Sequence, residues 1–195
     1  MDDPTDLDLA RRAAGGCEDA AREIVGRYGA RILGFLNKRN AGGSSNEDIL
    51  QETFITAFDR LPSFDPSRSF SAWIFGIAKN KASEHFRKSD RIEKLHARAI
   101  EERTAPVPPS QDLDRREQAA LFWERARTLL AAEPFECLWL RYQEELSVAE
   151  IAAALGKKVS AVKVALFRAR KTLAEHLDEF HPRHLQPTDP TRQPN

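Results

Sequence analysis

The sequence predicts an all-α fold made of two small helical domains, the second with a helix-turn-helix, joined by a proline-rich linker. Apolar residues recur at helical spacing in long segments, as at Ile24, Tyr28 and Ile32. No segment has the period-two alternation of β-branched and aromatic residues that is typical of a strand. The sequence APVPPSQ at 105–111 cannot continue a helix, and it divides the helical segments into two groups.

The composition is typical of a globular protein. Of the 195 residues, 41% are hydrophobic and 31% charged, which is too apolar for a disordered chain and too charged for a membrane protein. The acidic start MDDPTDLDLARR lacks the features of a signal peptide. We therefore expect a cytoplasmic protein with no membrane insertion, in which Cys17 and Cys137 are buried apolar side chains and form no disulfide.

The first group of helices lies before the proline-rich segment. Apolar periodicity predicts a helix at 18–40 that ends before a Gly-Gly pair. Asn46 is expected to cap a second helix at 47–61, which has acidic residues in its first turn. A third helix is expected over 70–88. The stripe expected to be buried in the second helix consists of Leu50, Phe54, Ala57, Phe58 and Leu61.

The second group begins with an amphipathic helix and a short helix from Pro134. The apolar residues expected along the amphipathic helix are Leu113, Leu121, Leu129 and Leu130. Ser147 and Glu150 have the spacing of a capping box, and Gly156 ends that helix. Ser160 is expected to cap the last helix. The buried face expected of the last helix consists of Val162, Leu166, Ala169, Leu173 and Leu177.

These elements define the domain organisation. We assign the first domain to 1–96, the linker to 97–111, the second domain to 112–178 and a disordered tail to 179–195.

Charge is balanced over the chain but not within it. Thirty basic residues oppose thirty acidic ones, yet residues 79–98 hold seven Lys or Arg against three acids. Residues 151–176 hold six against one. Two separate basic patches favour two contacts with a polyanion, and the acidic stretches leave surface for another partner.

Two motifs point to DNA. The first is a three-residue turn with Ala152 before it, Gly156 within it and a basic helix after it, which is the pattern of a helix-turn-helix. The alternative is a helical hairpin with a solvated basic face. In the first domain, Phe64, Phe70 and Trp73 precede the basic face of the third helix. These rings either stack on unpaired bases or belong to the core, and the pattern leaves both open.

Enzymatic chemistry has little support. No nucleophile is placed with a base, no glycine-rich phosphate loop is present, and the histidines are scattered, so we expect neither an enzyme nor a cofactor. His176, His181 and His184 have the chemistry of metal ligands, but no cysteine joins them, and a solvated tail is the simpler interpretation.

Two long stretches resemble a known family. EDILQETFITAFDRLPSFDPSRSFSAWIFGIAKNKASEHFRK at 47–88 resembles region 2 of bacterial sigma factors of the extracytoplasmic function (ECF) type. LWLRYQEELSVAEIAAALGKKVSAVKVALFRARKTL at 138–173 resembles their region 4. The resemblance covers about 18–95 and 113–177, in the family's order.

The resemblance implies a function and partners. It implies a sigma factor that binds core RNA polymerase and promoter DNA and directs promoter-specific transcription initiation. The first domain is then expected to recognise and melt the minus-10 element, and the second to recognise the minus-35 element. An anti-sigma factor is an expected further partner. The rival function is a stand-alone helix-turn-helix transcription regulator, which binds duplex DNA without polymerase.

The resemblance also assigns site residues, none of them catalytic or metal-binding. Core-polymerase binding is assigned to Asp48, Gln51 and Glu52. Minus-10 DNA binding is assigned to Phe64, Trp73, Lys79, Asn80 and Arg87. Minus-35 DNA binding is assigned to Lys158, Ser160, Lys163 and Arg168. Where the family has an arginine close to the DNA backbone, this chain has Ala165. Ala165 faces either the DNA or the core, because it follows the core residue Val162 by three positions.

Overall fold

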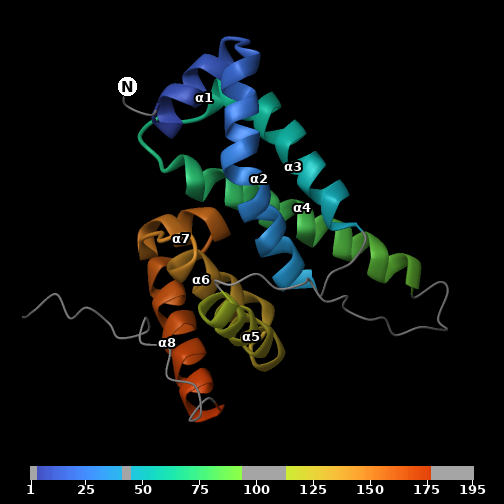
Figure 1. Cartoon of the computed structure of the whole chain (residues 1–195), viewed down its shortest axis with the longest axis vertical. Coiled ribbons are helices and arrows are strands. Elements are labelled where there is room, and N and C mark those ends of the chain that lie inside the picture. The colour runs from blue at the N-terminus through green and yellow to red at the C-terminus, as the bar shows by residue number, and fades with distance from the viewer. Residues whose placement is uncertain (1–3, 41–44, 94–112, 177–195) are drawn as a thin grey trace, which may run out of the picture.

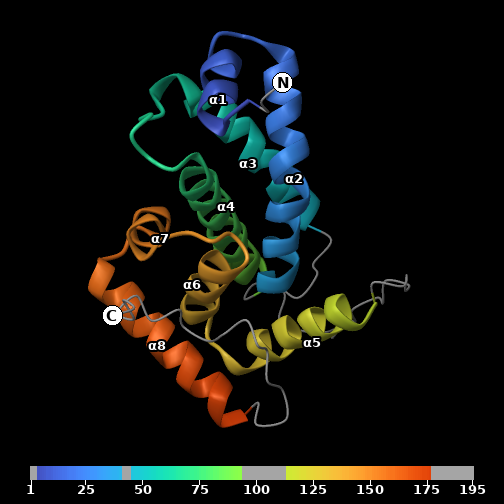
Figure 2. The ribbon, with the colours of Figure 1, turned by 60° about the vertical axis from the view of Figure 1, so that its left-hand side comes forward.

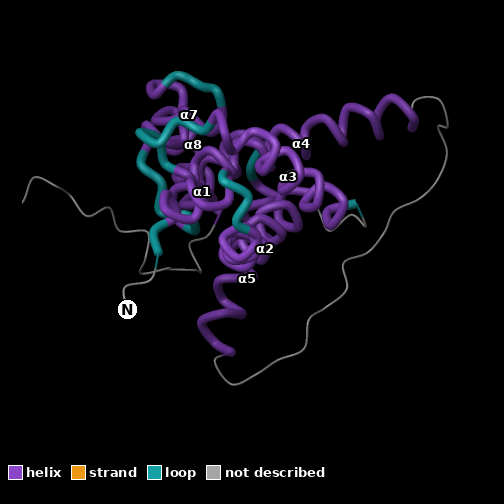
Figure 3. Tube along the Cα trace, turned by 90° about the horizontal axis from the view of Figure 1, so that it is seen from above, coloured by secondary structure: helices purple, strands orange, loops and turns teal. Residues whose placement is uncertain are grey.

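The structure is a computed structural model that describes residues 4–40, 45–93 and 113–176. Every regular element in these ranges is a helix, so the all-α prediction is confirmed (Figure 3). The elements are α1 (Asp6–Ala14), α2 (Glu18–Asn40), α3 (Asn46–Arg60), the 3-10 turn η1 (Leu61–Ser63), α4 (Phe70–Glu93), α5 (Leu113–Leu129), α6 (Ala132–Tyr142), α7 (Val148–Leu155) and α8 (Val159–His176). The predicted linker and tail lie outside the described residues, and none of the helices described could cross a membrane.

Helix α1 was not expected from the sequence. The hydroxyl of Thr5 accepts a hydrogen bond from the backbone N–H of Asp8 and so caps the helix, while Leu9 is buried. Across the contact with α2, the hydroxyl of Tyr28 donates to the carboxylate of Asp6. Burial, together with this bond, raises the pKa of Tyr28. Helix α1 also contacts η1, so it supports the chain that leads into α4.

The start of α3 differs from the sequence prediction. Asn46 does not cap the helix, because its side chain is buried and its Nδ2 donates to Asn37 Oδ1 at 2.8 Å. The residue before the helix is Ser45, whose side chain makes no capping bond. The buried face also differs: Ile49 and Thr53 are buried, whereas Leu50 and Phe58, which we expected there, are half-buried.

The second group of helices is built around aromatic rings. Trp123 of α5 packs against Phe135 and Trp139 of α6, with ring centroids 5.8 and 4.7 Å apart. These contacts set the rotation of α5, so Trp123 and Ala126 point inward. Leu121, which we expected in the apolar face, is exposed.

The helix-turn-helix begins with the predicted capping box. The backbone N–H of Ser147 donates to Glu150 Oε2 at 2.8 Å, and the backbone N–H of Glu150 donates to Ser147 Oγ at 3.2 Å. Gly156 ends α7 with φ of 65°, a left-handed conformation that favours glycine. Ser160 is not the cap of α8: the helix starts at Val159.

The two cysteines differ in environment. Cys137 is buried, and burial raises the pKa of its thiol to about 12. Cys17 is half-buried, which corrects the expectation that both are core residues. A hydrogen bond from the backbone of Ala20, together with one from Arg12, lowers the pKa of the Cys17 thiol.

The two groups of helices pack directly on each other (Figures 1 and 2). Helix α2 contacts α5 and α6, and α4 contacts α7. Gly76 is needed at the α4–α7 contact, because a Cβ atom there would lie 2.9 Å from the carbonyl oxygen of Ala154. Among the described residues, ion pairs cross from α2 to the second group at Arg31–Glu144 (2.5 Å), Lys38–Glu124 (2.5 Å) and Arg39–Glu136 (2.6 Å).

Candidate nucleic-acid interface

Helix α4 carries the polar residues assigned to the minus-10 element. Ile74, Phe75 and Ala78 are buried and fix the rotation of the helix. Asn80 and Arg87 are exposed on it, and Lys79 is partly exposed. The Nζ of Lys79 donates to Asn80 Oδ1 at 3.4 Å, so an ammonium group and an amide lie side by side. This pair can contact both a phosphate and a base edge.

The aromatic residues before α4 form one cluster. The Phe64 ring centroid lies 5.0 Å from that of Trp73 and 5.5 Å from that of Phe70. Phe70 is buried, so for this ring the core interpretation is correct. Phe64 and Trp73 are half-buried against the core, and each keeps exposed surface.

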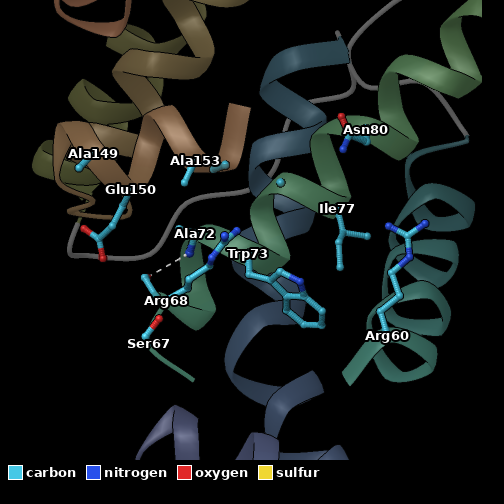
Figure 4. A pocket seen from close by; sticks show the side chains of 13 residues that line it. Arg60, Ser67, Arg68, Ala72, Trp73, Ile77, Asn80, Ala149, Glu150 and Ala153 are labelled. Carbon is cyan, nitrogen blue, oxygen red and sulfur yellow. Dashed lines mark hydrogen bonds between the residues drawn. The ribbon is translucent and has the colours of Figure 1, made fainter. Parts of the chain in front are cut away.

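A cavity of about 420 Å³ lies between α4 and α7. Arg68, Trp73 and Asn80 line one side, and Glu150 and Ala153 of α7 line the other (Figure 4). Two of the residues assigned to minus-10 binding on α4, Trp73 and Asn80, therefore share a cavity with the helix-turn-helix.

Helix α3 presents an acidic face. Asp48, Gln51 and Glu52, assigned to polymerase binding, are all exposed, and Glu52 Oε2 lies 3.7 Å from Lys81 Nζ. Ile55 follows them on the same face and is 54% exposed. We did not single out Ile55 from the sequence, although its i, i+3, i+4, i+7 spacing to the other three was the signal.

The residues assigned to the minus-35 element are all exposed: Ser160, Lys163 and Arg168 lie on α8, and Lys158 directly precedes it. Ala165 is only 7% exposed and belongs to the buried face of the helix. It therefore faces the core and not the DNA backbone. Val164 and Phe167, which are among the exposed apolar residues of α8, were not singled out from the sequence. Their signal was their position opposite the apolar stripe.

The assigned residues form separate surfaces. Helix α7 contacts α4 on one side and α8 on another, so the residues of α4 and α8 are not brought together (Figure 2). No cluster of metal-ligating side chains occurs in the described part of the chain. The Nδ1 of His176 lies 2.8 Å from the carbonyl oxygen of Thr172, while His181 and His184 lie outside the described residues.

Comparison with known proteins gives a consistent result. Residues 24–92 match the family described as Sigma-70 region 2, and residues 128–173 match Sigma-70, region 4. ECF RNA polymerase sigma factor BldN of Streptomyces coelicolor is 30% identical over 175 residues, which span 89% of this chain and 66% of BldN.

A second relative matches along nearly its whole length. RNA polymerase sigma factor CnrH of Cupriavidus metallidurans is 31% identical over 188 residues, covering 90% of this chain and 96% of CnrH. The structure of CnrH in complex with the cytosolic domain of CnrY has a TM-score of 0.64 and 28% identity, and covers 90% of this chain and 99% of that one. The chain therefore belongs to the ECF family of RNA polymerase sigma factors, which act in promoter-specific transcription initiation.

Proposed function

We propose that this sigma factor binds core RNA polymerase through α3, recognises and melts the minus-10 element through α4, and recognises the minus-35 element through α8. The observation that carries this proposal is the presence, on one chain and in the family's order, of both matched regions. A stand-alone regulator of duplex DNA needs only the second region, and it leaves the acidic face of α3 without a partner.

The α3 surface supports polymerase binding. Asp48 and Glu52 are exposed carboxylates, and Ile55 adds an exposed apolar side chain between Glu52 and the exposed Asp59. A surface with a central apolar residue and charged surroundings is typical of a protein interface. Because this surface is acidic, the complementary surface of its partner is expected to be basic.

The α4 surface supports capture of an unpaired base. Asn80 offers both a hydrogen-bond donor and an acceptor to a base edge, and the exposed part of Trp73 offers a ring for stacking. Arg87 lies two turns along the same helix, where it suits a backbone phosphate.

DNA binding by α4 requires the two groups of helices to separate. Asn80 and Trp73 face a cavity whose other side is α7, and DNA cannot occupy that side while α7 does. The compact arrangement is therefore a form without promoter DNA, held by the ion pairs between α2 and the second group.

Protein partners are part of the proposal. CnrH is known in complex with the cytosolic domain of CnrY, and we propose an anti-sigma factor as the corresponding partner of this chain. Because bacterial RNA polymerase acts in the cytoplasm, the proposed function places the chain there.

Permanganate footprinting of the minus-10 element tests the α4 assignment. Asn80→Ala is expected to reduce the reactivity of minus-10 thymines in the holoenzyme more than it reduces closed-complex binding. Glu84→Ala, which also removes an exposed side chain of α4, is the control and should leave melting unchanged. Wild-type thymine reactivity in the Asn80 variant contradicts the assignment.

A further inference from the structure

The cavity between α4 and α7 has the lining of a binding site for a small molecule. Its volume of about 420 Å³ is within the range of pockets that hold such ligands. Most of its wall is apolar, and both groups of helices contribute to it: Ala72, Gly76 and Ile77 come from α4, and Ala149, Ala153 and Ala154 from α7. The cavity therefore exists only while the two groups of helices are packed on each other.

Two facing walls of the cavity suit a flat aromatic ring. The indole ring of Trp73 is half-buried against Phe64, and its remaining surface lines the cavity. Ala149 and Ala153 of α7 line the other side (Figure 4). A ring placed between them stacks on the indole ring and is shielded from water by two methyl groups. Asn80 also lines the cavity and offers an amide donor and acceptor to polar atoms on the edge of such a ring.

The charged side chains are distributed unevenly in the cavity. In the view of Figure 4, Glu150 and Arg68 lie on one side of Trp73, and Arg60 lies on the other. Glu150 accepts a backbone N–H within its capping box, and Arg68 pairs with Asp65 at 3.3 Å, so both are held by groups of this chain. Arg60 is exposed, and its guanidinium group has the donor geometry that suits a phosphate. The part of the cavity near Arg60 therefore favours an anion.

A nucleotide combines the features that this cavity selects. It has a flat base with donors and acceptors on its edge, and a phosphate separated from the base by a sugar. We infer that the chain binds a nucleoside monophosphate between α4 and α7, with the base against Trp73 and the phosphate at Arg60. This site differs from the proposed DNA-binding surface, because α7 forms one of its walls and has to leave before promoter DNA can bind α4.

Nucleotide binding favours the compact arrangement of the chain. A ligand that binds only one of two forms shifts the equilibrium toward that form, by a factor that grows with ligand concentration. The separated form has no such cavity, so the nucleotide opposes the separation that melting of the minus-10 element requires. This regulatory consequence rests on the proposed function of α4, whereas nucleotide binding itself does not.

Equilibrium binding to the full chain tests the inference, with adenosine monophosphate as the probe. Adenosine lacks the phosphate and ribose phosphate lacks the base, so each should bind about tenfold more weakly than the nucleotide. Trp73→Ala and Arg60→Gln should each weaken nucleotide binding by about tenfold, because they remove the stacking ring and the cation. Val25→Ser, which changes an exposed residue of α2, is the control and should bind like the wild type.

Ala153→Leu separates the cavity from the DNA-binding surface. The larger side chain fills the space between α7 and Trp73, and Ala153 belongs to none of the surfaces proposed for polymerase or DNA. The variant should lose nucleotide binding and keep wild-type permanganate reactivity of minus-10 thymines in the holoenzyme. If small-angle X-ray scattering shows that this variant is expanded, Ala149→Leu fills the same cavity from the start of α7 and takes its place.

A kinetic measurement tests the regulatory consequence. Incubation of the wild-type chain with adenosine monophosphate, before core polymerase and promoter are added, should slow the appearance of thymine reactivity. The same incubation should have no effect on the cavity-filled variant, which excludes an action of the nucleotide on polymerase. An equal delay in both proteins contradicts regulation through this cavity.

Contrary results of the binding experiment are distinct from failure of the proposed function. Equal nucleotide binding by the wild type and by a compact, cavity-filled variant assigns the nucleotide to the DNA-binding surface alone and overturns the inference. Equal binding of ribose phosphate and the nucleotide shows a contact with the anion only and also overturns it, as does an absence of binding at millimolar nucleotide. Nucleotide binding at the cavity without any promoter-specific transcript leaves the inferred site standing and contradicts the proposed function.

Discussion

The guanidinium group of Arg39 and the carboxylate of Glu136 form a buried ion pair between α2 and α6. The Nε of Arg39 donates to Glu136 Oε1 at 2.6 Å, and the two side chains are only 10% and 5% exposed. Arg39 also donates to Ser83 Oγ at 3.1 Å, so the pair is tied to α4 as well. One bond network thus joins the segments on both sides of residues 94–112.

Charge reversal at Glu136 is expected to open the compact arrangement. Loss of one partner of a buried ion pair costs about 3–5 kcal/mol, and separation of the two groups of helices avoids that cost by exposing both charges to water. The radius of gyration of Glu136→Arg, measured by small-angle X-ray scattering, should therefore increase while the helix content stays unchanged.

Two further variants make this prediction specific. The double variant Arg39→Glu, Glu136→Arg restores opposite charges and should recover much of the compactness. Lys157→Glu disrupts the Lys157–Glu133 pair, which lies within the second group of helices, and should leave the radius of gyration unchanged. A compact Glu136→Arg protein contradicts the proposed role of the pair.

Gly76→Ala is expected to loosen the α4–α7 contact without weakening α4. The added Cβ atom would lie 2.9 Å from the backbone oxygen of Ala154, which cannot move independently of α7. In the separated form this clash is absent, and alanine stabilises a helix by about 1 kcal/mol relative to glycine. Fluorescence energy transfer between labels on α4 and α7 should decrease. Gly26→Ala in α2, where a Cβ atom meets nothing within 4 Å, should leave the transfer efficiency unchanged.

Asp48→Arg is expected to abolish co-purification with core polymerase. The substitution places a positive charge on the exposed acidic face of α3, where the proposed partner surface is basic. Glu47→Arg is a matched control, because Glu47 is also an exposed acid of the first turn, so the interaction with the helix dipole is lost equally. Equal retention of polymerase by both variants would contradict the assignment of polymerase binding to α3.

The capping box of α7 should give a pH-dependent contribution to stability. Hydrogen bonds from the side chain and backbone of Ser147 lower the pKa of Glu150 below its ordinary value of 4.5. A carboxylate with a lowered pKa stabilises the fold above pH 4.5, and this contribution is lost as the pH falls through the lowered pKa. Ser147→Ala should destabilise the chain by about 1 kcal/mol at neutral pH and by less in acid.

Two measurements check this prediction. The Glu150 pKa, followed by carboxyl carbon chemical shifts, should rise toward its ordinary value in Ser147→Ala. Ser160→Ala is the control, since the structure does not place Ser160 at the cap of α8. It should change the Glu150 pKa and the stability of the chain less than Ser147→Ala does. An unchanged Glu150 pKa in Ser147→Ala means that the bonds to Ser147 do not control the titration.

Local patterns predicted the turn of the helix-turn-helix and the described helices other than α1. The stripe through Ile24, Tyr28 and Ile32 is fully buried, and the capping box with Gly156 appears as expected. These features depend on neighbours a few residues away, which the sequence displays directly. The caps of α3 and α8 were wrong, because Asn46 bonds to Asn37 of another helix and α8 starts one residue before Ser160.

Contacts between the two groups of helices could not be predicted. The residues of the Arg39–Glu136 pair are separated by 97 positions, and nothing in the local pattern links them. The same holds for the close approach of Gly76 to Ala154. The site residues on α3, α4 and α8 were assigned by resemblance, and the structure adds their exposure. It also adds Ile55, Val164 and Phe167, whose exposed apolar side chains are meaningful only once the buried faces are known.

Reconstituted transcription tests the central claim most directly. Core RNA polymerase is mixed with this chain and a library of promoter fragments, and transcript starts are compared with those of core polymerase alone. The account predicts new start sites that require the chain and share two upstream elements, and it predicts their loss with Asp48→Arg but not with Glu47→Arg. Binding of the chain to duplex DNA, without association with polymerase and without new start sites, would contradict the account and favour a stand-alone helix-turn-helix regulator.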